Sequence, residues 1–119
     1  MDRDPAYLLD MLQAAQEIKT LSADMSWESF ERSKVHHYAL VKLIEVIGEA
    51  ARAISEATKL AHPEIPWIPI IDMRNHLVHR YFKIDLARVW DVVENHIDPL
   101  IRSLTPLVPT EDKDLDGAS

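Results

Sequence analysis

The feature that most constrains the fold is segment 27–59, in which apolar residues recur at helical spacing on two faces. One stripe consists of Leu40, Leu43, Ile44, Ile47, Ala51 and Ile54. The other consists of Val35, Ala39, Val46, Ala50, Ala53 and Ala57. A long helix with two apolar faces must be buried on two sides, and a chain of 119 residues has few helices to cover both. We therefore expect a homodimer whose interface covers the second stripe.

Helical spacing also governs the N-terminal part of the chain. There are only two glycines, and apolar residues recur at helical intervals up to about Leu21. Asp4 is expected to be the N-cap of this first helix, with Pro5 at the first helical position. Gly48 interrupts the long second helix, where a glycine costs about 1 kcal/mol relative to alanine. Either a neighbouring helix approaches closely there, or the glycine is a tolerated defect.

The second half of the chain predicts further short helices. Segment 62–69 contains three prolines and is expected to be a stiff connector. Pro69 suits the first turn of a third helix. Asp85 is a plausible N-cap for a fourth helix, and Pro99 lies near the start of a last segment, 100–104.

These patterns predict an all-α fold, specifically a small antiparallel helical bundle that forms a homodimer. No alternating strand pattern is present, and the length fits one domain. We place this domain at residues 1–109. The remaining residues, 110–119, are polar and acidic and are predicted to be a disordered tail.

Composition narrows the compartment and the class of partner. The chain has no cysteine, no apolar run long enough for a membrane span, and a charged N-terminus unlike a signal peptide. We therefore expect a cytoplasmic protein without membrane association. The net charge of −7 argues against general coating of nucleic acid, but segment 74–83 contains three basic residues, two histidines and no acid. A local basic site is therefore compatible with the acidic chain.

The candidate chemistry lies on the third predicted helix, at Arg74, Asn75 and His79. Asn75 and His79 are four residues apart and share a face, whereas Arg74 and His79 lie about 140° apart on an ideal helix. Two explanations remain open. The helix ends near His79, or an arginine and a histidine from two copies converge across a symmetric interface.

These residue types suit cleavage of RNA without a metal or cofactor. An arginine fork matches phosphate oxygens, and a histidine can take up and return a proton near neutral pH. Asparagine can orient either group by a hydrogen bond. Because the ribose 2′-hydroxyl is the nucleophile, the protein needs to supply only proton transfer and charge stabilisation.

Segment 74–81 resembles the R-x4-H-x-Y motif of HepT-like toxins, within the HEPN superfamily, with Arg80 at the variable position before Tyr81. The similarity extends to a mid-helix signature at 47–51, the connector at 62–67, and Val89-Trp90. These motifs occur in order and cover the chain from about Asp4 to about Leu107.

The resemblance implies a homodimeric helical bundle with a composite cleft at its interface, and a metal-independent endoribonuclease that acts on tRNA or mRNA. By position, Arg74 would stabilise the phosphate, His79 would act as general acid and base, and Asn75 would orient the site. Glu49 would support Arg74, and Arg80 would add local positive charge.

The resemblance also implies a partner. Such toxins are commonly neutralised by a minimal nucleotidyltransferase antitoxin of the MNT type, in some cases by transfer of AMP to the motif tyrosine, here Tyr81. A larger hetero-oligomer with this antitoxin is one expected assembly. An attached adenylate would add bulk and negative charge where the RNA phosphate must lie.

Simpler interpretations of the same residues remain. Arg74 could form an ion pair with Glu49, which is compatible with catalysis because the pair would hold the arginine in place. His79 could merely interact with the negative end of the helix dipole. A metal site from His76 and His79 would have only Asp72 nearby and is not expected. As an alternative function, the domain would be a catalytically silent helical dimer that binds and regulates a nucleotidyltransferase.

Overall fold

The computed structural model describes residues 2–80 and 83–109, and every regular element within these ranges is helical. The elements are α1 (Asp4–Ser22), α2 (Trp27–Glu31), α3 (Lys34–Ala53), α4 (Glu56–Ala61), α5 (Trp67–His79), α6 (Leu86–Asp91), the π-helical turn η2 (Val92–His96), α7 (Ile97–Leu104) and the 3₁₀ turn η3 (Thr105–Leu107). The predicted all-α class is therefore confirmed. Tyr81 and the predicted tail at 110–119 lie outside the described residues.

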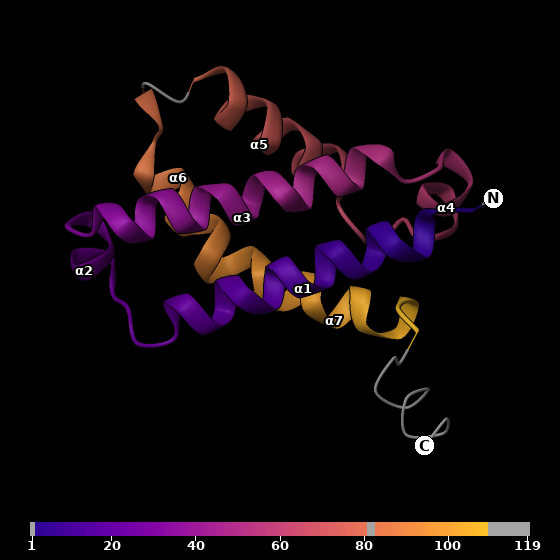
Figure 1. The fold of residues 1–119 in the computed structure, drawn as a ribbon, viewed down its shortest axis with the longest axis horizontal. Coiled ribbons are helices and arrows are strands. Elements are labelled where there is room, and N and C mark those ends of the chain that lie inside the picture. The colour runs from indigo at the N-terminus through magenta and orange to yellow at the C-terminus, as the bar shows by residue number, and fades with distance from the viewer. Residues whose placement is uncertain (1, 81–82, 110–119) are drawn as a thin grey trace.

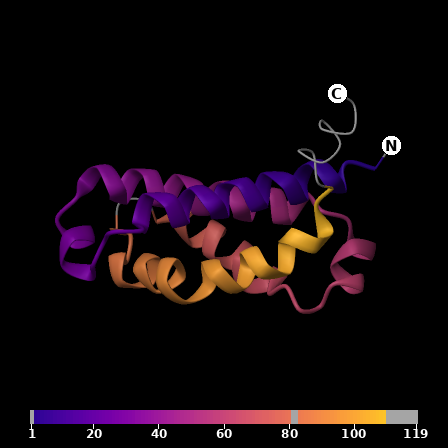
Figure 2. The same cartoon turned by 90° about the horizontal axis from the view of Figure 1, so that it is seen from below.

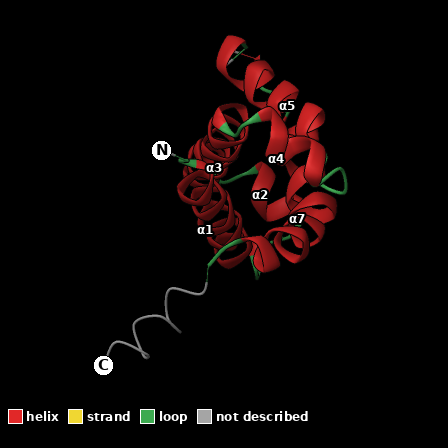
Figure 3. Ribbon diagram, turned by 90° about the vertical axis from the view of Figure 1, so that its right-hand side faces the viewer, coloured by secondary structure: helices red, strands yellow, loops and turns green. Residues whose placement is uncertain are grey.

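The long helices form an antiparallel bundle (Figure 1). α1 and α3 lie side by side in one layer, while α5 and the run from α6 to α7 form the other (Figure 2). α3 lies between α1 and α5, and α5 occupies the outer edge of the bundle (Figure 3). This arrangement leaves both flanks of α5 open to neighbouring hollows, which matters for the site. Within the described residues, no helix is long and apolar enough to cross a membrane.

The prediction of one helix over 27–59 is wrong, because the segment folds as α2, α3 and α4. Ser33 and Ser55 separate the three helices, each as an N-cap in extended backbone conformation. Ser33 Oγ accepts from the His36 N–H at 3.4 Å, and Ser55 Oγ accepts from the Thr58 N–H at 3.3 Å. A serine hydroxyl satisfies an amide that would otherwise lack a partner at a new helix start, so apolar periodicity alone overestimates helix length here.

Asp4 is not the N-cap of α1, contrary to prediction. It is the first helical residue, after Arg3, and its buried carboxylate turns towards the start of α4. There it accepts hydrogen bonds from the Ser55 N–H at 3.0 Å, Ser55 Oγ at 2.5 Å and Thr58 Oγ1 at 2.6 Å. The hydrogen bonds from Ser55 and then Thr58 lower the pKa of Asp4, and the charge of Lys59 acts in the same direction. The N-terminus of α1 is thereby fastened to the turn that follows α3.

The second half of the chain follows the prediction more closely. α5 begins at Trp67, with Pro69 in its first turn, and Asp85 caps α6 by accepting from the Arg88 N–H at 3.2 Å. However, the segment after Pro99 is not a separate element, because helical backbone continues from α6 through η2 into α7. In a regular α-helix the Pro99 ring would clash with the carbonyl four residues earlier. Here Pro99 lies in the first turn of α7, directly after the wide turn η2, which contains that earlier residue.

The two apolar stripes of segment 27–59 have different environments. The first stripe belongs to the core: Leu40, Ile44, Ile47, Ala51 and Ile54 are buried, and Leu43 is partly buried. In the second stripe only Ala50 is buried, whereas Val35 is 74% exposed. One copy of the chain thus covers only one of the two faces.

At Gly48, α3 and α5 approach each other closely. A Cβ built on Gly48 would lie 2.8 Å from Arg74 Cγ and 3.2 Å from the Ile70 carbonyl oxygen, and closer still to Arg74 Cβ. Of the two interpretations of this glycine, close helix approach is therefore confirmed. The absence of a side chain at Gly48 allows the stem of Arg74 to lie directly against α3.

We predict that Asp4→Asn lowers the free energy of unfolding at pH 7 by about 2 kcal/mol, because hydrogen bonds to a buried carboxylate are lost. The pKa of Asp4 is lower in the folded state than the usual 3.8, so its stabilisation is present above that value. The stabilisation is lost as the pH falls through the lower, folded pKa. Urea unfolding at several acidic pH values should show wild type and variant converging. Asp24→Asn, at an exposed turn position, is the control. An Asp4→Asn variant as stable as wild type at pH 7 would contradict the prediction.

We also predict that Gly48→Ala destabilises the protein by about 1–3 kcal/mol through overpacking against Arg74. In an uncrowded helix the same change would stabilise by about 1 kcal/mol, so the sign of the effect is the test. Unfolding of Gly48→Ala should also be measured in an Arg74→Gly background. Removal of the Arg74 Cβ should reduce the penalty, and an unchanged penalty would show that the contact is not its cause.

Candidate active site

Arg74, on the middle turns of α5, is held by two neighbours. Arg74 Nη2 forms an ion pair with Glu49 Oε2 at 2.6 Å, and Nη1 donates a hydrogen bond to Asn75 Oδ1 at 2.9 Å. The predicted pairing of Arg74 with Glu49 is therefore confirmed. Gly48 admits the stem of Arg74, and the next residue on α3 holds its charged end.

The Arg74–Glu49 pair is asymmetric in its exposure to solvent. The Arg74 side chain is 18% exposed, whereas that of Glu49 is 60% exposed. Arg74 Nε is buried and has no hydrogen-bond partner among the described residues. The arginine is thus positioned from beneath while its carboxylate partner stays accessible, so an incoming anion could compete for the guanidinium without moving α5.

A groove of about 560 Å³ runs beside Arg74, between α1, α3 and α5. Its lining consists of Tyr7, Asp10, Lys42, Glu45, Val46, Glu49, Ala50, Ala53, Arg74 and Val78. This set contains three carboxylates against two cations, together with apolar residues of the second stripe. A phosphate backbone lying in this groove would meet net negative charge, whereas a helix with apolar and mixed-charge residues would fit it.

Asn75 and His76 occupy the next positions of α5 and are half-buried. Asn75 orients its amide oxygen towards Arg74, which fits the orienting role predicted for it. His76 Nε2 is buried without a hydrogen-bond partner among the described residues. The sequence carried no signal that a nitrogen of His76 would be buried.

His79 is the last residue of α5 and is exposed. It does not line the Arg74 groove, and within the described residues no side-chain hydrogen bond or ion pair engages it. Arg80 is the C-cap, with its N–H donating to the His76 carbonyl at 2.9 Å. The helix therefore ends at His79, as one of the two explanations requires, and His79 lies outside the lining of the groove beside Arg74.

Positive charge gathers at the C-terminal end of α5. His79, Arg80 and Lys83 are all exposed there. Among the described residues, no group of three or more histidine, aspartate or glutamate side chains is placed to hold a metal ion. Tyr81, the predicted modification site, lies outside the described residues, next to this basic end in the sequence. The end of α5 thus presents proton-transfer and anion-binding groups without a metal cluster.

Known proteins are similar in sequence to this chain over most of its length. Residues 11–107 match the family described as "Ribonuclease HepT-like". A Methanocaldococcus jannaschii protein named "Putative RNase MJ1380" is 32% identical over 103 residues, covering 87% of this chain and 94% of the relative. "Probable ribonuclease HepT" of Thermococcus cleftensis is 35% identical over 94 residues, covering 79% of this chain and 86% of the relative. No solved structure matches this chain. The family match covers well over half of the chain, and the chain belongs to the HepT-like ribonuclease family.

Proposed function

We propose that this chain is a metal-independent endoribonuclease that cleaves tRNA or mRNA. The observation that supports this most directly is that α5 carries both Arg74, which is half-buried and held by Glu49, and His79, which is exposed. The chain also belongs to a ribonuclease family. The names of the relatives, which describe RNases, support the same assignment.

Each residue has a defined part in the proposed reaction. His79 takes the proton from a ribose 2′-hydroxyl, whose oxygen attacks the adjacent phosphorus, and a proton returns to the departing 5′-oxygen. As the 2′-oxygen attacks, the phosphorus becomes five-coordinate and negative charge increases on its oxygens. Arg74 stabilises this charge. Asn75 keeps the guanidinium oriented, as does Glu49 until phosphate replaces it. Arg80 adds positive charge where the RNA strand enters.

We further propose that two copies form the complete site. Arg74 lines the groove and His79 lies beyond it, which fits their separation of about 140° around a helix. The second apolar stripe of α3 borders the same groove and is largely uncovered in one copy. We propose that a second α3–α5 unit packed there buries this stripe and places the partner's His79 near Arg74.

The proposed biological role is that of a toxin in the cytoplasm, paired with a nucleotidyltransferase antitoxin of the MNT type. Transfer of AMP to Tyr81 would attach an anion to the residue that follows Arg80 in the sequence. That anion would repel the RNA phosphate and occupy the cations that bind it. The assembly with the antitoxin would be a hetero-oligomer built on the homodimer.

Purified protein should cleave tRNA or mRNA in the presence of EDTA. We predict that His79→Ala slows cleavage by about 10²–10⁴-fold, because proton transfer is lost. Arg74→Ala should slow it by about 10²–10³-fold through loss of charge stabilisation. Arg52→Ala and His96→Ala, at exposed positions outside the groove, are matched controls and should cleave normally. Intact RNA with wild-type protein would instead favour the silent regulatory module.

Mixing the two inactive variants tests the composite site. A mixed dimer of Arg74→Ala and His79→Ala retains one intact pair if arginine and histidine come from different copies. Cleavage should then return to about a quarter of the wild-type level after subunit exchange. No recovery, with exchange verified by mass spectrometry, would place both residues of each site in one copy.

Incubation with the cognate nucleotidyltransferase and ATP should increase the mass of the chain by one or more AMP units. Tyr81→Phe should abolish the increase, because it lacks the accepting hydroxyl. Tyr38→Phe, at a residue that is 74% exposed, is the control and should be labelled fully. Labelling that persists in Tyr81→Phe would place the modification elsewhere.

A further inference from the structure

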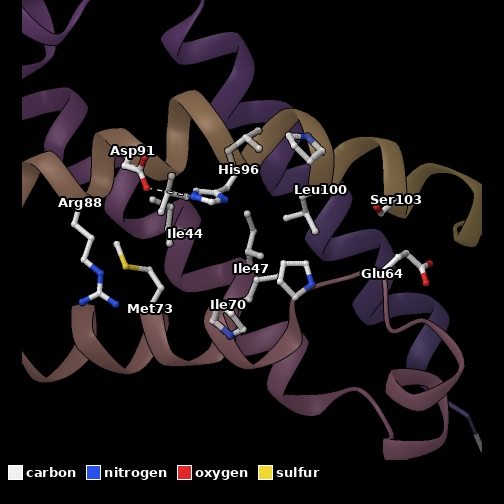
Figure 4. A pocket seen from close by; sticks show the side chains of 15 residues that line it. Ile44, Ile47, Glu64, Ile70, Met73, Arg88, Asp91, His96, Leu100 and Ser103 are labelled. Carbon is white, nitrogen blue, oxygen red and sulfur yellow. Dashed lines mark hydrogen bonds and ion pairs between the residues drawn. The ribbon is translucent and has the colours of Figure 1, made fainter.

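A second hollow lies on the other flank of α5, away from the Arg74 groove. It has a volume of about 330 Å³ and is enclosed by α5, the run from α6 to α7, and the side of α3 that carries Ile44 and Ile47 (Figure 4). Its other walls are mostly apolar, including Ile70, Met73 and Leu100, while Glu64 lines the end away from Arg88 (Figure 4). Neither Arg74 nor His79 lines it, so this cavity is separate from the proposed ribonuclease site.

The π-helical turn η2 places polar groups at one end of the cavity. Asp91 and His96 are five residues apart, and in an α-helix they would diverge by about 140°. Across the wide turn, His96 Nε2 instead lies 3.2 Å from Asp91 Oδ2, and both residues line the cavity. Turns of this kind occur mostly as single turns inside α-helices, and they are frequent at functional sites.

Arg88, one turn before Asp91, supplies a cation at the same end of the cavity (Figure 4). Asp91 is occupied by other donors, because Asn95 Nδ2 donates to its Oδ1 at 2.7 Å and His96 contacts its Oδ2. The hydrogen bond from Asn95 lowers the pKa of Asp91, and the hydrogen bond from His96 acts in the same direction. The ionised form of the carboxylate is therefore the one that these two partners stabilise. No ion pair engages the guanidinium of Arg88 within residues 2–80 and 83–109, which leaves a planar cationic fork beside apolar walls.

We propose that this cavity binds a small apolar molecule carrying one carboxylate, with the carboxylate on Arg88 and the hydrocarbon along Ile44, Ile47 and Ile70. The volume falls within the range of small-molecule pockets, which are mostly apolar with a few placed polar groups. A guanidinium pairs with a carboxylate through two parallel hydrogen bonds.

Methyl NMR can test this proposal directly, with decanoate below its micelle-forming concentration as the probe. Four isoleucines line the cavity: Ile44, Ile47, Ile70 and Ile97. With isoleucine methyls labelled, their resonances should shift in a saturable manner, while those of Ile18 and Ile54, buried elsewhere in the core, stay unchanged. Shifts spread over all isoleucines, or none at all, would overturn the proposal.

The charge on Arg88 is tested by a matched pair of ligands and variants. Arg88→Gln should weaken decanoate binding by about two- to fivefold, as expected for a solvent-accessible charge pair, and leave decanol binding unchanged. Arg102→Gln, an exposed arginine of α7 outside the cavity, should alter neither. Equal binding of decanoate to wild type and Arg88→Gln would overturn the assignment of the carboxylate.

A variant that fills the cavity distinguishes a ligand site from an interface between copies. Ser103, half-buried at the rim, can be changed to Trp, with Ser103→Ala as the control. Ser103→Trp should abolish the methyl shifts while circular dichroism and sedimentation match those of wild type. If the wild-type chain forms an oligomer that Ser103→Trp dissociates, this cavity is an interface between copies and the proposal fails.

Discussion

The contact between α3 and α5 at Gly48 is the constraint on which the rest of the structure depends. The missing side chain brings the two helices close enough for the Arg74 stem to lie on α3, where Glu49 meets the guanidinium. α5 lies at the outer edge of the bundle and is fixed chiefly by this contact. Its position in turn creates two hollows, one beside Arg74 and one between α5 and the α6–α7 run.

Local chemistry explains which parts of this fold could be predicted from sequence. Asp85 was predictable as a cap because it directly precedes an apolar helical pattern. The breaks at Ser33 and Ser55 were not, since the stripe that reaches Ala57 continues across Ser55, and at both serines the hydroxyl competes with the helix for backbone amides. Asp4 shows a further limit of prediction from local sequence. The residue that donates hydrogen bonds to its carboxylate, Ser55, is some fifty residues away in the chain, so no local rule brings the two together.

Of the side-chain pairs that line the two hollows, the sequence predicted one and not the other. A carboxylate within an apolar helix needs a partner, which made the pairing of Glu49 with Arg74 a reasonable expectation. The pairing of Asp91 with His96 could not be anticipated, because spacing of five residues separates side chains on an α-helix. Only Pro99 signalled an irregular backbone, and it did so without revealing that the irregularity would be a wide turn.

The distribution of charge around α5 explains why an acidic chain could act on RNA. The groove beside Arg74 contains Asp10, Glu45 and Glu49 and would repel phosphate, whereas the end of α5 exposes Arg80 and Lys83. RNA would therefore approach along that end and reach the guanidinium only from the rim of the groove. A second copy packed there would exclude water from around Arg74, which would strengthen the attraction between its guanidinium and a phosphate oxygen.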